Sequence, residues 1–394
     1  MEREMQMNKG KTIFAQLMEF LPGYEFQRCV EKYRGDYKVK EFSCLEQFYV
    51  MAFAQIAYRE SLRDTVTCLE AAGPRLYHMG IRKRPSLNNL SHANMTRDWR
   101  IFADVAQVLI KRARKLYEGE QVSEDLHQAI YALDSTTIDL CLSLFRWAKF
   151  RRRKGAIKLH VQMEIRSSMP TVIYVTDGKV HDVNFLDLLE LEPGAIYIMD
   201  RGYVDFKRLF EFCRNCSFFV IRAKRNLQYR VVKKKKSCMK KGIISDQVIV
   251  LCGYYQNRNY PAELRRIKCS DAETKMKLVI LTNNFFLPAK TIAFLYRCRW
   301  RIEIFFKWIK QNLRIKTFFG TSENAVKAQI WIAICVYAMV FIMQKELGIR
   351  KSAYEILQVL SLNLFDRGSL EELLLSVNAS ENNNGSCKQL LLFK

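Results

Sequence analysis

The first hundred residues carry apolar side chains at three- and four-residue steps, the spacing of one face of a helix. This spacing runs from Thr12 to Val108 and is clearest between Phe14 and Leu21, whereas strand-like alternation is absent. Residues that favour helix N-termini gather in Ser86–Asn94, and helical spacing resumes over Asp98–Leu116. The pattern predicts a helical N-terminal domain, which we place at residues 1–122.

Two later segments resemble each other, since each is an apolar run of strand length that ends in a carboxylate. They are Ala129–Asp134 and Ala195–Asp200, and both predict buried strands with an aspartate at the C-terminal end. Between them, residues 157–165 alternate between apolar and polar side chains, which predicts a half-exposed strand, and residues 171–176 predict another. Strands of this kind among helical segments indicate an α/β fold.

After the second aspartate the chain moves between predicted helices and strands. Residues 204–213 predict a helix and residues 217–222 a strand, and several β-rich pieces with polar connectors follow. Helical spacing returns at Ala289 and continues to about Glu346, and the Asn-rich residues 382–386 are expected to be disordered. The expected division is a helical N-terminal domain at 1–122, a first core part at 123–222, a β-rich insertion at 223–286, a second core part at 287–347, and a C-terminal helical segment with a disordered tail at 348–394.

The balance of charges points to a polyanionic partner. Lys and Arg total 64 against 40 Asp and Glu, a formal net charge of +24, which favours nucleic acid ahead of an anionic membrane surface. The longest apolar run, Ile330–Met343, would span only about 21 Å as a helix, whereas a bilayer core needs about 20 residues. Met1–Lys11 lacks the apolar stretch of a signal peptide. We therefore expect a cytoplasmic protein, associated with the nucleoid, with no membrane partner and a buried core helix over the apolar run.

The 12 cysteines are scattered along the chain. The only close pair is Cys213 and Cys216, with no second pair or histidine at zinc-finger spacing. We expect reduced, mostly buried thiols in preference to a zinc or redox site, which remains the alternative.

Three carboxylates are candidates for catalysis. Asp134 and Asp200 end the two predicted strands, and Glu303 lies in a segment with helical spacing. Two-metal phosphoryl transfer requires hard oxygen ligands of this kind, which hold two Mg²⁺ or Mn²⁺ ions about 4 Å apart. Without metal, three buried carboxylates would repel one another and raise their pKa values. An acidic centre in a basic chain therefore indicates a site where cations meet a polyanion.

The glutamate shares its helical face with cations and an aromatic ring. On a continuous helix Tyr296, Arg299, Glu303 and Lys310 would fall within an arc of about 60°. Lys310 would then lie about 10 Å from Glu303, at a phosphate next to the reacting one. A solvated amphipathic helix with charge pairs three and four residues apart is the alternative.

At this point the chain resembles a known family. Its Y-(2)-R-(3)-E-(6)-K spacing is similar to the signature of family four of the bacterial insertion-sequence transposases, and the resemblance extends over about Ala129–Leu347. Three further stretches resemble that family's motifs around the two aspartates: Leu133-Asp-Ser-Thr136, Thr176-Asp-Gly-Lys-Val-His-Asp182 and Met199-Asp-Arg-Gly-Tyr203.

The resemblance implies a fold and an activity. It implies a ribonuclease-H-like core with a β insertion, in which Asp134, Asp200 and Glu303 are the metal ligands. It also implies cut-and-paste transposition through hairpin ends by a homodimer that holds double-stranded DNA, both the terminal inverted repeats of the element and its target. Four residues would contact DNA: Tyr296, Arg299, Lys310 and, as an aromatic that stacks near the hairpin, Trp300. A core tryptophan is the alternative for Trp300.

Other polar residues have structural interpretations that we favour. Asp139 could rival Asp134 as a ligand, but its surroundings are less apolar. His160 and His181 could be general bases, yet a two-metal site needs none, so we expect a strand-surface residue and a turn residue. The basic runs Arg151–Lys154 and Lys233–Lys236 are expected to contact the DNA backbone, with solvated loops as the alternative.

Two other functions remain open from the sequence. A non-catalytic, domesticated DNA-binding protein would share the basic charge, but the intact carboxylates and signature argue against it. A ribonuclease-H-like nuclease would use the same carboxylates, but it gives no reason for the helical N-terminal domain and the β insertion.

Overall fold

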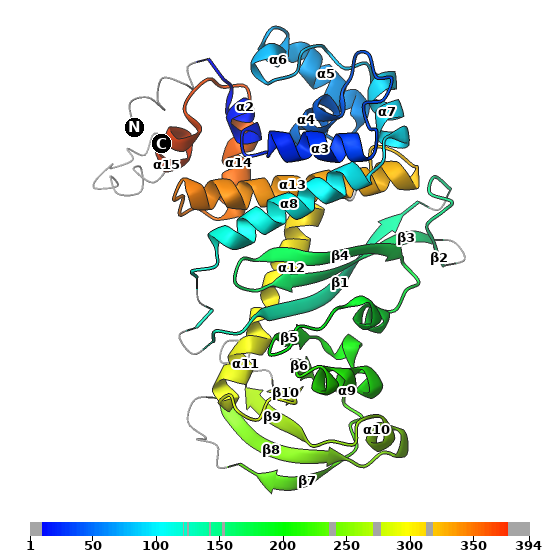
Figure 1. Ribbon diagram of the computed structural model, residues 1–394, viewed down its shortest axis with the longest axis vertical. Coiled ribbons are helices and arrows are strands. Elements are labelled where there is room, and N and C mark those ends of the chain that lie inside the picture. The colour runs from blue at the N-terminus through cyan, green and yellow to red at the C-terminus, as the bar shows by residue number, and fades with distance from the viewer. Residues whose placement is uncertain are drawn as a thin grey trace, which may run out of the picture. The chain divides into compact units, whose positions relative to one another are not determined.

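The computed structural model describes residues 10–376, apart from 121, 124–125, 142, 152–153, 236–241, 271–276 and 313–317. Contacts divide the chain into two compact units (Figure 1). The helical unit combines Met1–Leu116 with Trp308–Lys394, and the sheet unit is Tyr117–Lys307. The predicted disordered residues 382–386 and the side chains of Arg151–Lys154 lie outside the described part.

The helical unit confirms the helices predicted for the first hundred residues. Side-chain caps begin many of its helices: Ser43 and Ser352 form capping boxes, and Ser86 accepts from the amide of Asn89 at 3.1 Å. Its elements are α2 (Ile13–Met18), α3 (Gly23–Lys32), α4 (Cys44–Ile56), α5 (Leu62–Ala72), α6 (Arg75–His78), α7 (Leu87–Thr96), α8 (Arg100–Leu116), η3 (Trp308–Asn312), α13 (Glu323–Glu346), α14 (Ala353–Asn363) and α15 (Leu370–Ser376).

The apolar run of the sequence forms α13, the central helix of the helical unit. By length and composition α13 could cross a membrane, but the other helices of this unit bury most of it. Trp331 stacks on Trp99 with ring centroids 6.4 Å apart, and Gln55 donates to the carbonyl of Gln329 at 3.0 Å. The buried core helix is therefore confirmed. α13 packs with the N-terminal helices, so Trp308–Lys394 belongs to the helical unit. The sequence pattern groups residues 287–347 with the catalytic core.

The sheet unit contains the predicted strands. Its elements are β1 (Ile130–Leu140), β2 (Lys149–Arg151), β3 (Lys154–Glu164), β4 (Met169–Asp177), η1 (Asp182–Leu188), β5 (Ile196–Met199), η2 (Arg201–Tyr203), α9 (Phe206–Arg214), β6 (Phe218–Arg222), β7 (Tyr229–Lys234), β8 (Ile243–Leu251), α10 (Tyr254–Asn259), β9 (Leu264–Ser270), β10 (Lys277–Thr282), α11 (Ala289–Cys298) and α12 (Trp300–Lys307).

The core of the sheet has the strand order β4-β3-β1-β5-β6. β3 pairs antiparallel with both β1 and β4, whereas β1, β5 and β6 run parallel to one another. Three antiparallel strands followed by two parallel ones confirm the α/β core and its ribonuclease-H-like arrangement.

The β-rich insertion continues this sheet. β10 pairs antiparallel with β6, in register Leu281↔Ile221, and β9, β8 and β7 follow outward. The described strands therefore form one ten-stranded sheet (Figure 1). Because the backbone groups at the β6 edge are paired by β10, the insertion also closes an edge that would otherwise expose unpaired donors and acceptors.

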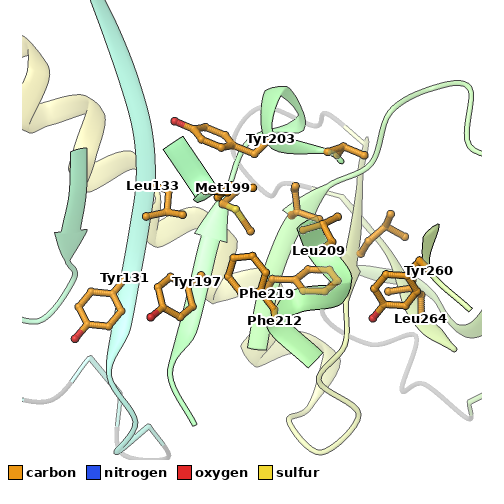
Figure 2. Close-up of a cluster of buried hydrophobic side chains, with 14 of the residues drawn as sticks. Tyr131, Leu133, Tyr197, Met199, Tyr203, Leu209, Phe212, Phe219, Tyr260 and Leu264 are labelled. Carbon is orange, nitrogen blue, oxygen red and sulfur yellow. The ribbon is translucent and has the colours of Figure 1, made fainter. Parts of the chain in front are cut away.

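One face of the parallel strands is covered by a cluster of aromatic and aliphatic side chains (Figure 2). Tyr131 on β1 and Tyr197 on β5 lie side by side with ring centroids 5.3 Å apart, and Phe212 of α9 meets Tyr197 edge-on at 5.3 Å. α9 begins where Asp205 caps the amide of Arg208. The packed cluster fixes β1 and β5 side by side, so it fixes the residues at their ends as well.

The expected half-exposed strand at residues 157–165 is wrong, because both faces of β3 are buried. His160 is 1% exposed, and its ring stacks on Phe185 of η1 at 5.4 Å. Gln162 is also buried and donates to Thr171 Oγ1 at 3.1 Å. η1 covers the polar face at His160, and side chains of the neighbouring strand β4 pair with His160 and Gln162. Alternation along β3 alone could not reveal these partners.

Candidate active site

The two aspartates lie at the point where parallel pairing stops. β1 and β5 pair over four positions, the last being Leu133↔Met199, so Asp134 and Asp200 are the first residues beyond it. The prediction that Asp134 ends a strand is wrong, since β1 continues to Leu140 by pairing with β3. Asp200 does follow the last residue of β5. Ligand sites of parallel sheets lie at this carboxyl edge.

Glu303 reaches the site from a helix that breaks close to it. α11 ends at Cys298, Arg299 is its C-terminal cap, and α12 carries Glu303. Ile302 and Phe305 are buried, and Arg301 donates to the carbonyl of Ile165 at 2.5 Å. These contacts hold α12 against the core sheet and present Glu303 on its more exposed side.

Two residues of the signature contact the three carboxylates. Arg299 donates to Asp134 Oδ2 at 3.0 Å and also forms an ion pair with Glu303. Tyr296 donates its hydroxyl to Asp200 Oδ1 at 3.1 Å. The structure therefore brings Asp134, Asp200, Glu303, Tyr296 and Arg299 together in one site of the sheet unit.

Burial sets the electrostatics of this site. It raises the pKa of Asp134 to about 6, and the negative charges of Glu303 and Asp200 add to the rise, while the amide of Ser135 and the Arg299 guanidinium oppose it. Burial and the charge of Asp200 raise the pKa of Tyr296 to about 12. A carboxylate so affected by two neighbouring carboxylates belongs to a site that a cation would stabilise.

The donor set fits a divalent metal. As the side chains stand, no three of the described Asp, Glu, His and Cys side chains are close enough to hold one ion. The Arg299 guanidinium instead bridges Asp134 and Glu303, so a cationic group already stands between two of the three carboxylates. Carboxylate oxygens are the ligands that Mg²⁺ and Mn²⁺ prefer.

Two further residues of the predicted DNA contact, Trp300 and Lys310, are not among the partners of the three carboxylates described above. Trp300 is 63% exposed on α12, which excludes the core alternative. Lys310 is in η3, a π-helical segment that follows α12 directly, so the regular α-helical winding that would place Lys310 on the face of Glu303 is not kept.

Asp182, whose partner Ser135 is next to Asp134, is not among the predicted site residues. Asp182 accepts from the hydroxyl of Ser135 at 2.5 Å and from Lys158 Nζ at 3.0 Å. Burial is the main cause that raises the pKa of Tyr203, and the negative charges of Asp134 and Asp182 raise it further. The sequence signal was present, because Asp182 ends the stretch that resembles the family's motif.

The alternative residues make none of the hydrogen bonds described above for the three carboxylates. Asp139 and His181 are exposed, whereas burial lowers the pKa of His160 to about 4. The described cysteines are free, and Cys213 lies 3.0 Å from the hydroxyl of Tyr260, with no zinc-like cluster among the described side chains. Five of the ten described cysteines are buried, whereas the sequence analysis expects most of the thiols to be buried.

Comparisons with known proteins give the family. Residues 126–339, more than half of the chain, match the family "Transposase DDE domain", and residues 9–82 match a domain of unknown function. The chain is 32% identical over 261 residues to "Putative transposase y4zB" of Sinorhizobium fredii, which covers 65% of this chain and 70% of that protein.

Other relatives and one solved structure are more distant. "Probable transposase for insertion sequence element IS5377" of Geobacillus stearothermophilus is 30% identical, over 52% of this chain and 54% of its own. "Putative transposase for insertion sequence element IS4SA" of Synechocystis is 23% identical, over 82% of this chain and 90% of its own. The piggyBac transposase synaptic complex with hairpin DNA matches with a TM-score of 0.45 at 8% identity, over 95% of this chain and 81% of its own.

The matched transposase domain spans all three carboxylates and the whole sheet core. The chain belongs to the DDE transposases of bacterial insertion sequences, enzymes that cut and join DNA with the help of divalent metal ions.

Proposed function

We propose that Asp134, Asp200 and Glu303 are the catalytic triad of this transposase and hold two Mg²⁺ or Mn²⁺ ions. The observation that carries the proposal is the meeting of all three carboxylates with Arg299 and Tyr296 at the end of the β1–β5 pairing. When bound, the ions would polarise the phosphodiester and activate the attacking hydroxyl.

The chain's own residues would divide the remaining work. Arg299, which pairs with Asp134 and Glu303, would turn to a DNA phosphate once the carboxylates carry metal. Tyr296 would give up its hydrogen bond to Asp200 and orient the DNA strand next to the site. Both residues thus neutralise or partner the carboxylates in the free protein and contact DNA in the complex.

The reaction we propose is cut-and-paste transposition through hairpin ends, as in family four. The signature spacing supports this, and so does the exposure of Trp300, which leaves its ring accessible to a displaced base. Lys310 would bind a phosphate.

The proposed partner is double-stranded DNA, the element's terminal inverted repeats and its target, held by a homodimer in the bacterial cytoplasm at the nucleoid. The formal net charge of +24 supports a DNA partner. Of the predicted basic run, Lys233 and Lys234 are exposed on β7, which is compatible with a contact to the DNA backbone, whereas Lys235 is partly buried and donates to the carbonyl of Phe285. The predicted N-terminal domain at 1–122, most of which belongs to the helical unit, would bind the ends.

The carboxylates are tested by substitution. Asp134→Asn, Asp200→Asn and Glu303→Gln should each lower cleavage of a labelled element end by at least about 1000-fold, because each removes a metal ligand. Asp139→Asn is the matched control, since it alters an exposed carboxylate on the same strand, and it should cut normally. Products are resolved on a denaturing gel, and end binding is measured by gel shift.

Near-normal cleavage by any of the three variants would remove that residue from the triad. Wild-type protein that binds the ends but never cuts them would support the non-catalytic alternative.

A further inference from the structure

Helix α7 exposes a face of uncharged polar side chains. Asn88, Asn89, Ser91, His92, Met95 and Thr96 are exposed, whereas Leu90 and Ala93 are buried. No acidic residue occurs between Leu87 and Thr96. Surface helices usually expose Lys, Glu and Arg, so a face of amides, hydroxyls, an imidazole and a thioether is unusual for a face that only meets water.

The opposite side of α7 is held by a buried polar network. Asn94 accepts from Gln47 Nε2 at 2.7 Å, and Gln47 in turn accepts from Arg97 at 3.0 Å. Asn324 of α13 donates to the carbonyls of Asn94 and Arg97 at 3.0 and 2.6 Å. Fully paired networks of this kind fix one arrangement, so the exposed face of α7 is presented rigidly.

A groove of about 780 Å³ runs along α7, and the segment 33–42 forms its other wall. This segment contributes Arg34, Lys38 and Lys40, and Tyr37 is 67% exposed with Lys38 over its ring. Gly35 lets the wall pack closely, because a Cβ there would lie 2.5 Å from Ile101 Cδ1 and 2.7 Å from Cys44 Sγ.

Cations also precede α7. Arg82, Lys83 and Arg84 are exposed, although Lys83 pairs with Glu41 at 3.0 Å and Arg84 with Glu70 at 2.5 Å. Exposed pairs of this kind contribute little and exchange readily for phosphate in a polyanion's field. The neutral hydrogen-bonding face therefore has basic side chains nearby, in the facing wall of the groove and in the segment just before the helix.

We propose that α7 enters the major groove of the element's end and reads its base edges, while Arg34, Lys38 and Lys40 bind the sugar–phosphate backbone. The inference rests on the proposed function and names its sequence-reading element. A ten-residue helix is about 15 Å long and fits a groove about 12 Å wide. Asn matches the paired donor and acceptor of adenine, and Met95, which is 55% exposed, can pack on a thymine methyl group. The deep, narrow major groove of RNA would not admit α7.

The test is a selection from random-sequence DNA duplexes with the full-length Asp200→Asn protein in EDTA, so binding is measured without cleavage. The wild-type α7 face should enrich one motif. Asn89→Ala and His92→Ala should each weaken binding to that motif about 10- to 100-fold, because a bidentate base contact contributes about 1–3 kcal/mol. Their affinity for an unrelated duplex should be unchanged.

Contacts to the DNA backbone should change affinity in a different way. Lys38→Ala and Lys40→Ala should weaken binding to the motif and to the unrelated duplex alike, and each should reduce the salt dependence by about one counterion. Thr67→Ala, an exposed change on α5, is the matched control and should alter neither affinity.

Loss of motif and unrelated binding together in Asn89→Ala and His92→Ala, or loss of neither, would overturn the role of α7. Absence of any enriched motif would do the same. The selection is carried out without divalent metal, so it does not depend on the three carboxylates. If the wild-type protein binds the motif but never cuts it with metal present, the proposed function is contradicted and the role of α7 is not.

Discussion

His160 is a residue whose burial the sequence did not predict. It is 1% exposed, stacks on Phe185 and lies 3.1 Å from Thr176 Oγ1, and its Nδ1 has no hydrogen-bond partner among the described residues. Burial lowers its pKa from 6.5 to about 4; the charge of Asp182 opposes the fall and that of Lys158 adds to it. The neutral ring is therefore the form that the fold accommodates.

Stability should consequently fall in mild acid. Below pH 6.5 the unfolded chain binds a proton at His160 that the folded chain binds only near pH 4, so the stability present above pH 6.5 is lost as the pH falls through this window. Between pH 7 and 5 His160 should contribute a loss of about 2 kcal/mol, which Asp134 partly offsets because its raised pKa of about 6 acts in the opposite direction. Urea unfolding of wild type and His160→Gln in EDTA measures the His160 contribution as the difference between their two pH dependences.

His181→Gln, at an exposed position, is the control and should behave as the wild type. Equal pH dependence of wild type and His160→Gln would show that another group causes the acid sensitivity.

Trp300 also belongs to the residue scale. Hairpin formation requires a distorted end with a displaced base, and stacking on an exposed ring contributes about 1–3 kcal/mol. Trp300→Ala should therefore slow hairpin formation about 10-fold or more while the first nick changes less than about twofold. Lys310→Ala should weaken both steps. Labelled ends on a denaturing gel separate nicked strand from hairpin.

Ile304→Ala is the matched control, because Ile304 is exposed one turn further along α12. Equal loss of nick and hairpin in Trp300→Ala would contradict a stacking role, and breaks that never pass through a hairpin would exclude this route.

At the scale of elements, the insertion contains a buried ion pair whose arginine also contacts the segment before α11. Arg265 of β9 meets Asp246 of β8 through two hydrogen bonds of 2.9 and 2.7 Å, with both side chains 5% exposed or less. Arg265 also donates to the carbonyl of Leu287 at 2.5 Å, just before α11 begins. The insertion therefore helps to position the helix that carries Tyr296.

Breaking this pair should be costly. Asp246→Ala leaves a buried guanidinium without its carboxylate, and we expect a loss of about 3–5 kcal/mol in the free energy of unfolding. Asp246→Leu combined with Arg265→Met should be less destabilising than Asp246→Ala, because no charge is then left buried. Denaturant unfolding of the three proteins measures both values.

Glu211→Ala, which removes an exposed pair with Arg214, is the control and should cost less than about 1 kcal/mol. A loss that small for Asp246→Ala would mean that the buried pair does not hold the insertion in place.

At the scale of the whole molecule, the two ends of the chain build one unit and the sheet unit is inserted between them. The amide of Ile13 donates to the carbonyl of Asp366 at 2.8 Å, and Gln16 donates to that of Gly368 at 2.7 Å. The helical unit therefore requires both ends, and a fragment that stops at residue 122 would lack α13 and the partners of α2.

The net charge gives the whole-molecule prediction. Affinity for DNA should fall log-linearly with salt, with a slope of about 0.9 for each neutralised phosphate, because binding releases condensed counterions. Titration of a fluorescent duplex between 50 and 200 mM salt should show a loss of at least about 100-fold for several such contacts. A binding constant that does not change over this range would refute an interface dominated by phosphate contacts.

The sequence by itself determined the local elements and the identity of the candidate ligands. Helical spacing and capping serines predicted most of α2 to α8, and apolar runs predicted β1 and β5 with their aspartates. These features are encoded locally, because caps bond within one turn and periodicity places side chains on one face. The motifs contain Asp134, Asp200 and Glu303, so short stretches of sequence are enough to indicate the candidate ligands.

Only the tertiary structure decided what those elements meet. β1 runs past Asp134 because β3 pairs with it there, and His160 is buried because η1 covers it. The insertion joins the core sheet through β6, and α13 packs with helices from the other end of the chain. Arg299 turns to Asp134, 165 residues away, because two carboxylates need a cation. Hydrogen bonds and burial between distant segments leave no periodic trace in the chain, so local pattern could not reveal them.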